Sequence, residues 1–65
     1  MNKETIIRNV FIQMGEKGIN KSQLTEKSGL NKMTISKLLN GKTDPKPETV
    51  KRIAEALGVE MKDLI

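Results

Sequence analysis

The chain has 65 residues and a formal net charge of +4, so it can bury only one small core and has little room for an enclosed active site. It has no cysteine and no histidine, which excludes disulfides, Cys/His zinc sites, cysteine nucleophiles and the usual general base at neutral pH. No apolar run approaches the roughly 20 residues that cross a bilayer, and no signal-peptide pattern opens the sequence, so we expect a soluble, cytoplasmic protein.

The first predicted helix covers residues 2–17. Asn2 can cap its start, and Gly15 and Gly18 are predicted to end it. Its apolar residues recur at spacings of one, three or four, which is typical of a helix with one buried face. These residues are Ile6, Ile7, Val10, Phe11 and Met14.

A second, shorter helix is predicted over residues 21–28, with the sequence KSQLTEKS. Asn20 and Gln23 have the spacing of a capping box, in which each side chain accepts a hydrogen bond from the other residue's backbone amide. Gly29 follows, and glycine is well suited to the left-handed conformation that ends helices. Both ends of this helix are therefore marked in the sequence.

The third predicted helix runs from Lys32 to about Leu39 and stops at an Asn-Gly pair. We assign Asn31 to its cap rather than to a ligand. Together with the second helix and the short turn between them, it forms a helix-turn-helix.

The third helix has two different faces. At about 100° per residue, Ile35, Leu38 and Leu39 form its buried side. Met33 and Lys37 point almost directly away from that side, which makes Met33 an apolar side chain on a polar, basic surface. Four further residues share or flank the outer surface: Lys32, Thr34, Ser36 and Asn40.

The loop KTDPKP precedes a fourth predicted helix, for which Pro47 is well placed as the first residue. The helix extends to about Leu57, and Gly58 ends it. The closing segment VEMKDLI is predicted to form a fifth helical turn that packs onto the others. The apolar residues of these two elements are Val50, Ile53, Ala54, Leu57, Val59, Met61, Leu64 and Ile65.

The positive charge is concentrated in residues 21–46. This segment has six lysines against Glu26 and Asp44, so it carries the whole net charge of +4, and the remaining residues balance. A basic surface of this kind favours an anionic partner over a uniformly solvated chain.

Residues 19–59 resemble the lambda-repressor-like, Cro-type (XRE) helix-turn-helix family. The resemblance rests on the order and spacing of several markers, each weak alone: Leu24, Gly29, Ile35, Leu38, Asn40 to Lys42, Pro45 and Ile53 to Val59. It implies an all-α fold, a compact five-helix DNA-binding domain over residues 1–65, whose third helix contacts bases in the major groove.

The resemblance also implies roles for individual residues. Base-contacting positions hold Lys32, Met33 and Lys37, with Thr34 and Ser36 as lesser candidates. Positions near the phosphate backbone hold Lys21, Asn40, Lys42, Thr43 and Lys46. We expect no catalytic residue, metal, cofactor or small-molecule ligand, and no enzymatic activity.

Two departures from the family pattern stand out. Many relatives pair an arginine late in the first helix with a glutamate near the end of the third, where this chain has Met14 and Leu39. Apolar groups can replace a buried ion pair with little loss of folding stability when both members of the pair change together. Thr25 stands where the family favours alanine at a tight helix contact, and its hydroxyl can bond the carbonyl four residues earlier.

The sequence therefore predicts a bacterial or phage transcriptional regulator, with a repressor favoured, that binds a near-palindromic double-stranded DNA operator as a homodimer. Met61, Leu64 and Ile65 are the candidate dimer contacts, with a purely core role as the equal alternative. Two other readings stay open. One is an antitoxin or controller protein that also contacts a partner protein, against which the lack of an extra tail counts. The other is a small protein-interaction module with an acidic partner.

Overall fold

The computed structural model describes residues 2–65, which form four α-helices and one short 3₁₀ turn without any strand. None of these helices is long and apolar enough to span a membrane. The elements in chain order are α1 (Lys3–Lys17), α2 (Lys21–Ser28), α3 (Lys32–Leu39), α4 (Pro47–Leu57) and η1 (Met61–Asp63).

Three helices begin at asparagine caps, as predicted. The side chains of Asn2, Asn20 and Asn31 each accept a hydrogen bond from the backbone amide three residues later, at 3.0, 2.8 and 2.7 Å. Gln23 completes the capping box by accepting from the Asn20 amide at 2.9 Å. These bonds satisfy amides that the first helical turn leaves without a partner.

The helix ends also follow the prediction, with one correction. The prediction that Gly15 helps to end the first helix is wrong, because α1 continues through Gly15 to Lys17. Gly18 ends it instead, in the left-handed conformation with φ of 66°. Pro47 is the first residue of α4, and Gly58 follows its last residue.

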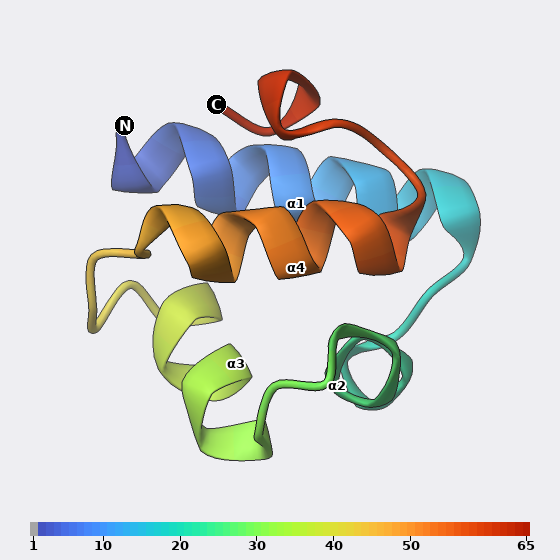
Figure 1. The fold of residues 1–65 in the computed structure, drawn as a ribbon, viewed down its shortest axis with the longest axis horizontal. Helices are drawn as coiled ribbons and strands as arrows, with labels where there is room; N and C mark the ends of the chain where they lie inside the picture. The colour runs from blue at the N-terminus through green and yellow to red at the C-terminus, as the bar shows by residue number, and fades with distance from the viewer. Residues whose placement is uncertain (1) are drawn as a thin grey trace.

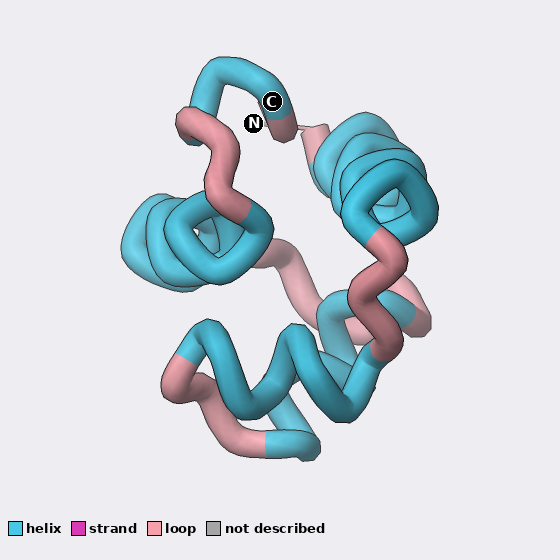
Figure 2. The backbone as a smooth tube through the Cα atoms, turned by 90° about the vertical axis from the view of Figure 1, so that its right-hand side faces the viewer, coloured by secondary structure: helices cyan, strands magenta, loops and turns pink. Residues whose placement is uncertain are grey.

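The four α-helices form two layers, one of α1 and α4 and the other of α2 and α3. Figure 1 shows α1 and α4 side by side, with α2 and α3 on one side of this pair and η1 on the other. Figure 2, turned by 90°, shows the same order, with the two long helices between η1 and the shorter helices. Because α4 packs against α1, α2 and η1, it connects both layers.

The core lies between these layers and draws on every α-helix and on the C-terminal segment. Met14 and Leu39, the two apolar residues at the positions where many relatives have an ion pair, are both buried in it. Its other members are Ile6, Val10, Leu24, Ile35, Leu38, Val50, Ile53, Ala54, Leu57 and Leu64.

One expectation about this core is wrong, and the predicted number of helices needs a correction. Phe11, predicted for the buried face of the first helix, is 50% exposed because it lies at the edge of the stripe formed by Ile6, Val10 and Met14. The five-helix count is corrected to four α-helices in residues 2–65, and the predicted fifth helical turn is the 3₁₀ turn η1, closed by the Leu64 amide donating to the Met61 carbonyl at 2.9 Å. The segment after Gly58 is too short for a stable α-helix.

Candidate nucleic-acid interface

The turn between α2 and α3 is fixed by a buried serine. The Ser28 hydroxyl donates to the Thr25 carbonyl at 3.1 Å and accepts from the Leu30 amide at 3.2 Å. Gly29, between them, has a φ of 71°, a conformation that costs other residues strain. Ser28 is not among the residues identified from the sequence. The one feature that could have indicated its role is its position directly before Gly29. The turn sets the angle at which α3 leaves α2.

The helix α3 presents the two faces that its sequence predicts. Ile35 and Leu38 are buried, whereas Met33 is 63% exposed. Lys32 and Lys37 are also exposed, and Thr34 and Ser36 are half-buried. Around Met33 the surface has a hollow of about 430 Å³, lined by Asn31, Lys32, Met33 and Ser36. An exposed apolar side chain thus lies beside cations and hydroxyls.

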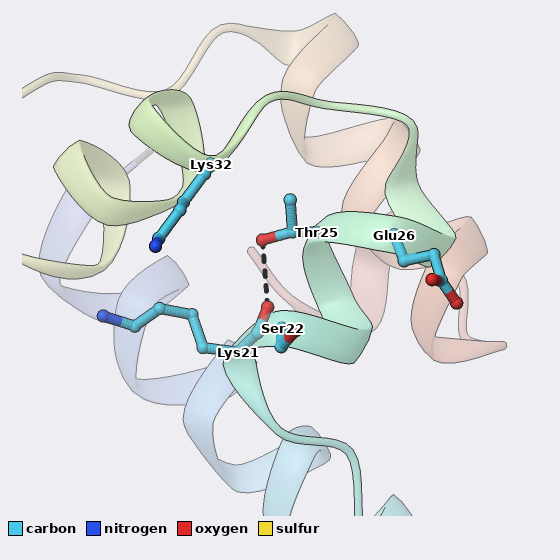
Figure 3. Close-up of a pocket in the computed structure, with 5 residues that line it drawn as sticks. All are labelled: Lys21, Ser22, Thr25, Glu26 and Lys32. Atoms are coloured by element: carbon cyan, nitrogen blue, oxygen red, sulfur yellow. Dashed lines mark hydrogen bonds between the residues drawn. The ribbon is translucent and has the colours of Figure 1, made fainter.

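A second hollow, of about 450 Å³, lies between the starts of α2 and α3. Lys21 and Lys32 line it from the first positions of the two helices. Figure 3 shows both lysine side chains extending to the same side, whereas Glu26 points away. The two cations therefore face one region of space, although the family resemblance implies phosphate contact for Lys21 and base contact for Lys32.

Thr25 lines the same hollow, and its hydroxyl donates to the Lys21 carbonyl at 2.9 Å (Figure 3). This is the bond expected for a threonine hydroxyl within a helix. It satisfies the hydroxyl locally, so the replacement of the family's alanine leaves no polar group without a partner at the contact between α2 and α3.

The segment after α3 is a tight turn that exposes cationic and hydroxyl side chains. The Gly41 and Lys42 amides donate back to the Leu38 and Lys37 carbonyls at 3.0 and 2.9 Å. The Asn40 amide group bonds the Ser36 hydroxyl at 3.3 Å, so this candidate phosphate contact is partly engaged within the chain. Lys42, Thr43 and Lys46 are exposed.

One residue of this region was missed by sequence reasoning. The Lys3 ammonium, at the start of α1, donates to the Gly41 carbonyl at 3.1 Å and lies 3.9 Å from a carboxylate oxygen of Asp44. No sequence pattern predicts this contact, because 38 positions separate Lys3 from Gly41. It ties the N-terminal helix to the turn that follows α3.

The candidate contact lysines carry uncompensated charge. Among residues 2–65 the ion pairs join Lys3 to Asp44, Arg52 to Glu48 and Lys62 to Glu60. None of these pairs uses a lysine from α2, α3 or the loop after α3. The lysines of this region that remain available to an anionic ligand are the five candidate contacts, Lys21, Lys32, Lys37, Lys42 and Lys46, together with Lys27 of α2.

The candidate dimer residues divide into three kinds of environment. Leu64 is fully buried, so its side chain belongs to the core and not to the surface. The Asn9 side chain holds the Leu64 carbonyl at 2.8 Å. Met61 is half-buried, and Ile65 is 53% exposed. This segment lies across the α1 and α4 pair from α3 (Figure 1).

The chain matches a known protein family. A family model described as helix-turn-helix matches residues 12–64, which is most of the chain and includes α2, α3 and the loop after them. No curated protein and no solved structure matches the chain. The matched residues contain the turn fixed by Ser28 and the outward face of α3.

Proposed function

The chain belongs to the helix-turn-helix family of lambda-repressor and Cro-like (XRE-type) DNA-binding regulators, and from this premise we propose that it is a repressor that recognises a near-palindromic operator. The observation that carries the proposal is the outward face of α3, where Met33 stands exposed between Lys32 and Lys37. In this proposal α3 lies in the major groove of double-stranded DNA.

The proposed base contacts follow from side-chain chemistry. Lysine donates hydrogen bonds that suit O6 and N7 of guanine, and an apolar tip suits the methyl group of thymine. We therefore propose that Lys32, Lys37 and Met33 favour half-sites that contain both guanine and thymine. Thr34 and Ser36 are half-buried, which supports a smaller contribution of these two residues to base contact.

The proposed phosphate contacts flank α3 on both sides. Lys21 lies at the start of α2, and Lys42, Thr43 and Lys46 follow α3 in the exposed loop, with Asn40 beside them. Contacts to phosphates supply most of the affinity and little of the sequence preference. They hold the protein on the duplex while α3 meets the bases.

A homodimer is part of the proposal. One recognition helix meets only a few base pairs, and each mismatch costs roughly 1 to 3 kcal/mol, so a monomer discriminates poorly within a genome. Two copies related by a two-fold axis place their α3 helices about one DNA turn apart. We propose Ile65 and Met61 as the contact residues, supported by the exposure of Ile65. Because its proposed ligand is bacterial or phage DNA, we propose that the protein acts in the cytoplasm.

Selection of bound sequences from a random duplex pool tests the proposal. We expect two similar half-sites in inverted orientation, and binding whose logarithm falls steeply with the logarithm of salt concentration. Absence of binding to any duplex at low salt would contradict DNA recognition and favour a protein-interaction module. A single half-site without symmetry would contradict the dimer, and formation of a stable complex with a second protein on the operator would favour the antitoxin or controller reading.

A further inference from the structure

We propose that Lys3 controls the phosphate-binding loop by keeping Asp44 away from the loop's lysines, a role that rests on the proposed DNA binding. Lys3 is a positioning residue here, because it acts through Asp44 and Gly41. Asp44 is an acidic side chain in an unfavourable place for a DNA-binding surface.

Asp44 lies within the proposed phosphate-binding region. It is the one acidic residue between Glu26 and Glu48, a stretch that holds five lysines. It lines a surface hollow of about 360 Å³ together with Lys37, Thr43 and Lys46. A carboxylate in this place repels phosphates. It can also pair with the lysines that are proposed to bind those phosphates.

The structure gives this carboxylate another partner. The Lys3 ammonium lies 3.9 Å from the Asp44 carboxylate and donates to the Gly41 carbonyl at 3.1 Å, so one side chain contacts both ends of the turn. Lys3 is half-buried, whereas the Asp44 side chain is 90% exposed, so the Lys3 ammonium is the cation that the structure places beside it. The positive charge of Lys3, at the start of α1, offsets the negative charge of Asp44.

Removal of Lys3 releases Asp44. The freed carboxylate can then turn toward Lys46 or Lys37, which line the same hollow, and compete with DNA phosphates for them. An isolated surface ion pair adds little to folding stability, so the main consequence of the Lys3 contact falls on DNA binding and not on the fold.

A double-mutant cycle in the full chain tests this role. The affinity for a fixed duplex is measured at several salt concentrations for Lys3→Met, Asp44→Asn and the double variant. We expect Lys3→Met to weaken binding about three- to tenfold at low salt and to reduce the salt slope by about one, as for a lost phosphate contact. In the Asp44→Asn background the same change should cost less than about twofold, since no carboxylate is left to compete.

Lys62→Met is the matched control. It also removes a paired lysine, 3.5 Å from Glu60, but on η1, across the molecule from α3. Its effect reports the loss of one positive charge without a change at the loop, and should stay below about twofold. All variants are compared at a temperature where circular dichroism shows each to be folded.

An equal loss from Lys3→Met in both backgrounds would overturn the inference, because it would mean that Lys3 binds a phosphate itself or acts only by holding Gly41. A loss no greater than that of Lys62→Met would overturn it as well. Failure of the parent chain to bind any duplex would instead contradict the proposed function, so the two failures are distinguishable.

Discussion

The two faces of α3 belong to the same eight residues and carry opposite constraints. The inner face is bound to the rest of the chain, because Ile35 and Leu38 are enclosed by the core. The outer face, with Met33 and Lys37, has no such contacts and is free to meet a ligand. Substitutions on the inner face should therefore change stability, and those on the outer face or beside it should change DNA binding.

The largest effect is expected on the inner face. Ile35→Ala should lower the free energy of unfolding by about 2 to 5 kcal/mol, because Ile35 is fully buried and a cavity would remain. Urea denaturation followed by circular dichroism measures this change. Met33→Ala on the outer face is the matched control and should stay within about 0.5 kcal/mol of the parent chain. Similar losses for the two variants would contradict the division between the faces.

The next effect concerns the loop that follows α3. Lys42→Ala should weaken binding to all duplex sequences alike, by about tenfold at low salt, and should reduce the salt slope by about one. Titration of two unrelated duplexes by fluorescence anisotropy measures both quantities. Lys62→Ala serves as the control for net charge. A change in sequence preference after Lys42→Ala would show that Lys42 contacts bases and not phosphates.

A smaller effect is expected at the start of α3. Asn31→Ala should reduce stability by about 1 kcal/mol, because the Asn31 side chain accepts the Thr34 amide at 2.7 Å. Asn31→Ser keeps a capping oxygen and should restore most of the loss. Thermal unfolding of both variants checks the cap. If selected DNA sequences changed in both variants while stability did not, Asn31 would be a base contact.

The smallest free-energy change is expected at Met33. Met33→Ala should relax the preference for thymine at one or two positions of the half-site, since loss of one methyl contact is worth about 0.8 kcal/mol. Binding to a series of single-base variants of the selected site measures it. An equal loss at every base would place Met33 among the general contacts, in the same class as Lys42.

Much of the fold could be predicted from spacing along the chain. The asparagine caps, Gly18, Gly29, Gly58 and Pro47 define helix ends through contacts within three or four residues, and the periodicity of Ile35, Leu38 and Leu39 identifies the inner face of α3. The outward direction of Met33 follows from the same geometry.

The failures of prediction lie where two elements meet. Phe11 has the helical spacing of a core residue, but it lies at the edge of the stripe that packs into the core, and it stays half-exposed. At the C-terminus the neighbours Leu64 and Ile65 have the same chemistry, yet one is fully buried and the other is 53% exposed. Composition and periodicity do not separate such cases.

The sequence by itself determined the helices, their caps, the two faces of α3 and the basic segment, because each depends on residues close together in the chain. Tertiary structure alone decided that Lys3 reaches Gly41 and Asp44, that Asn9 holds the Leu64 carbonyl, and that Lys21 and Lys32 share one hollow. Such contacts join positions up to 55 residues apart, as between Asn9 and Leu64, and they arise only when core burial brings the helices together.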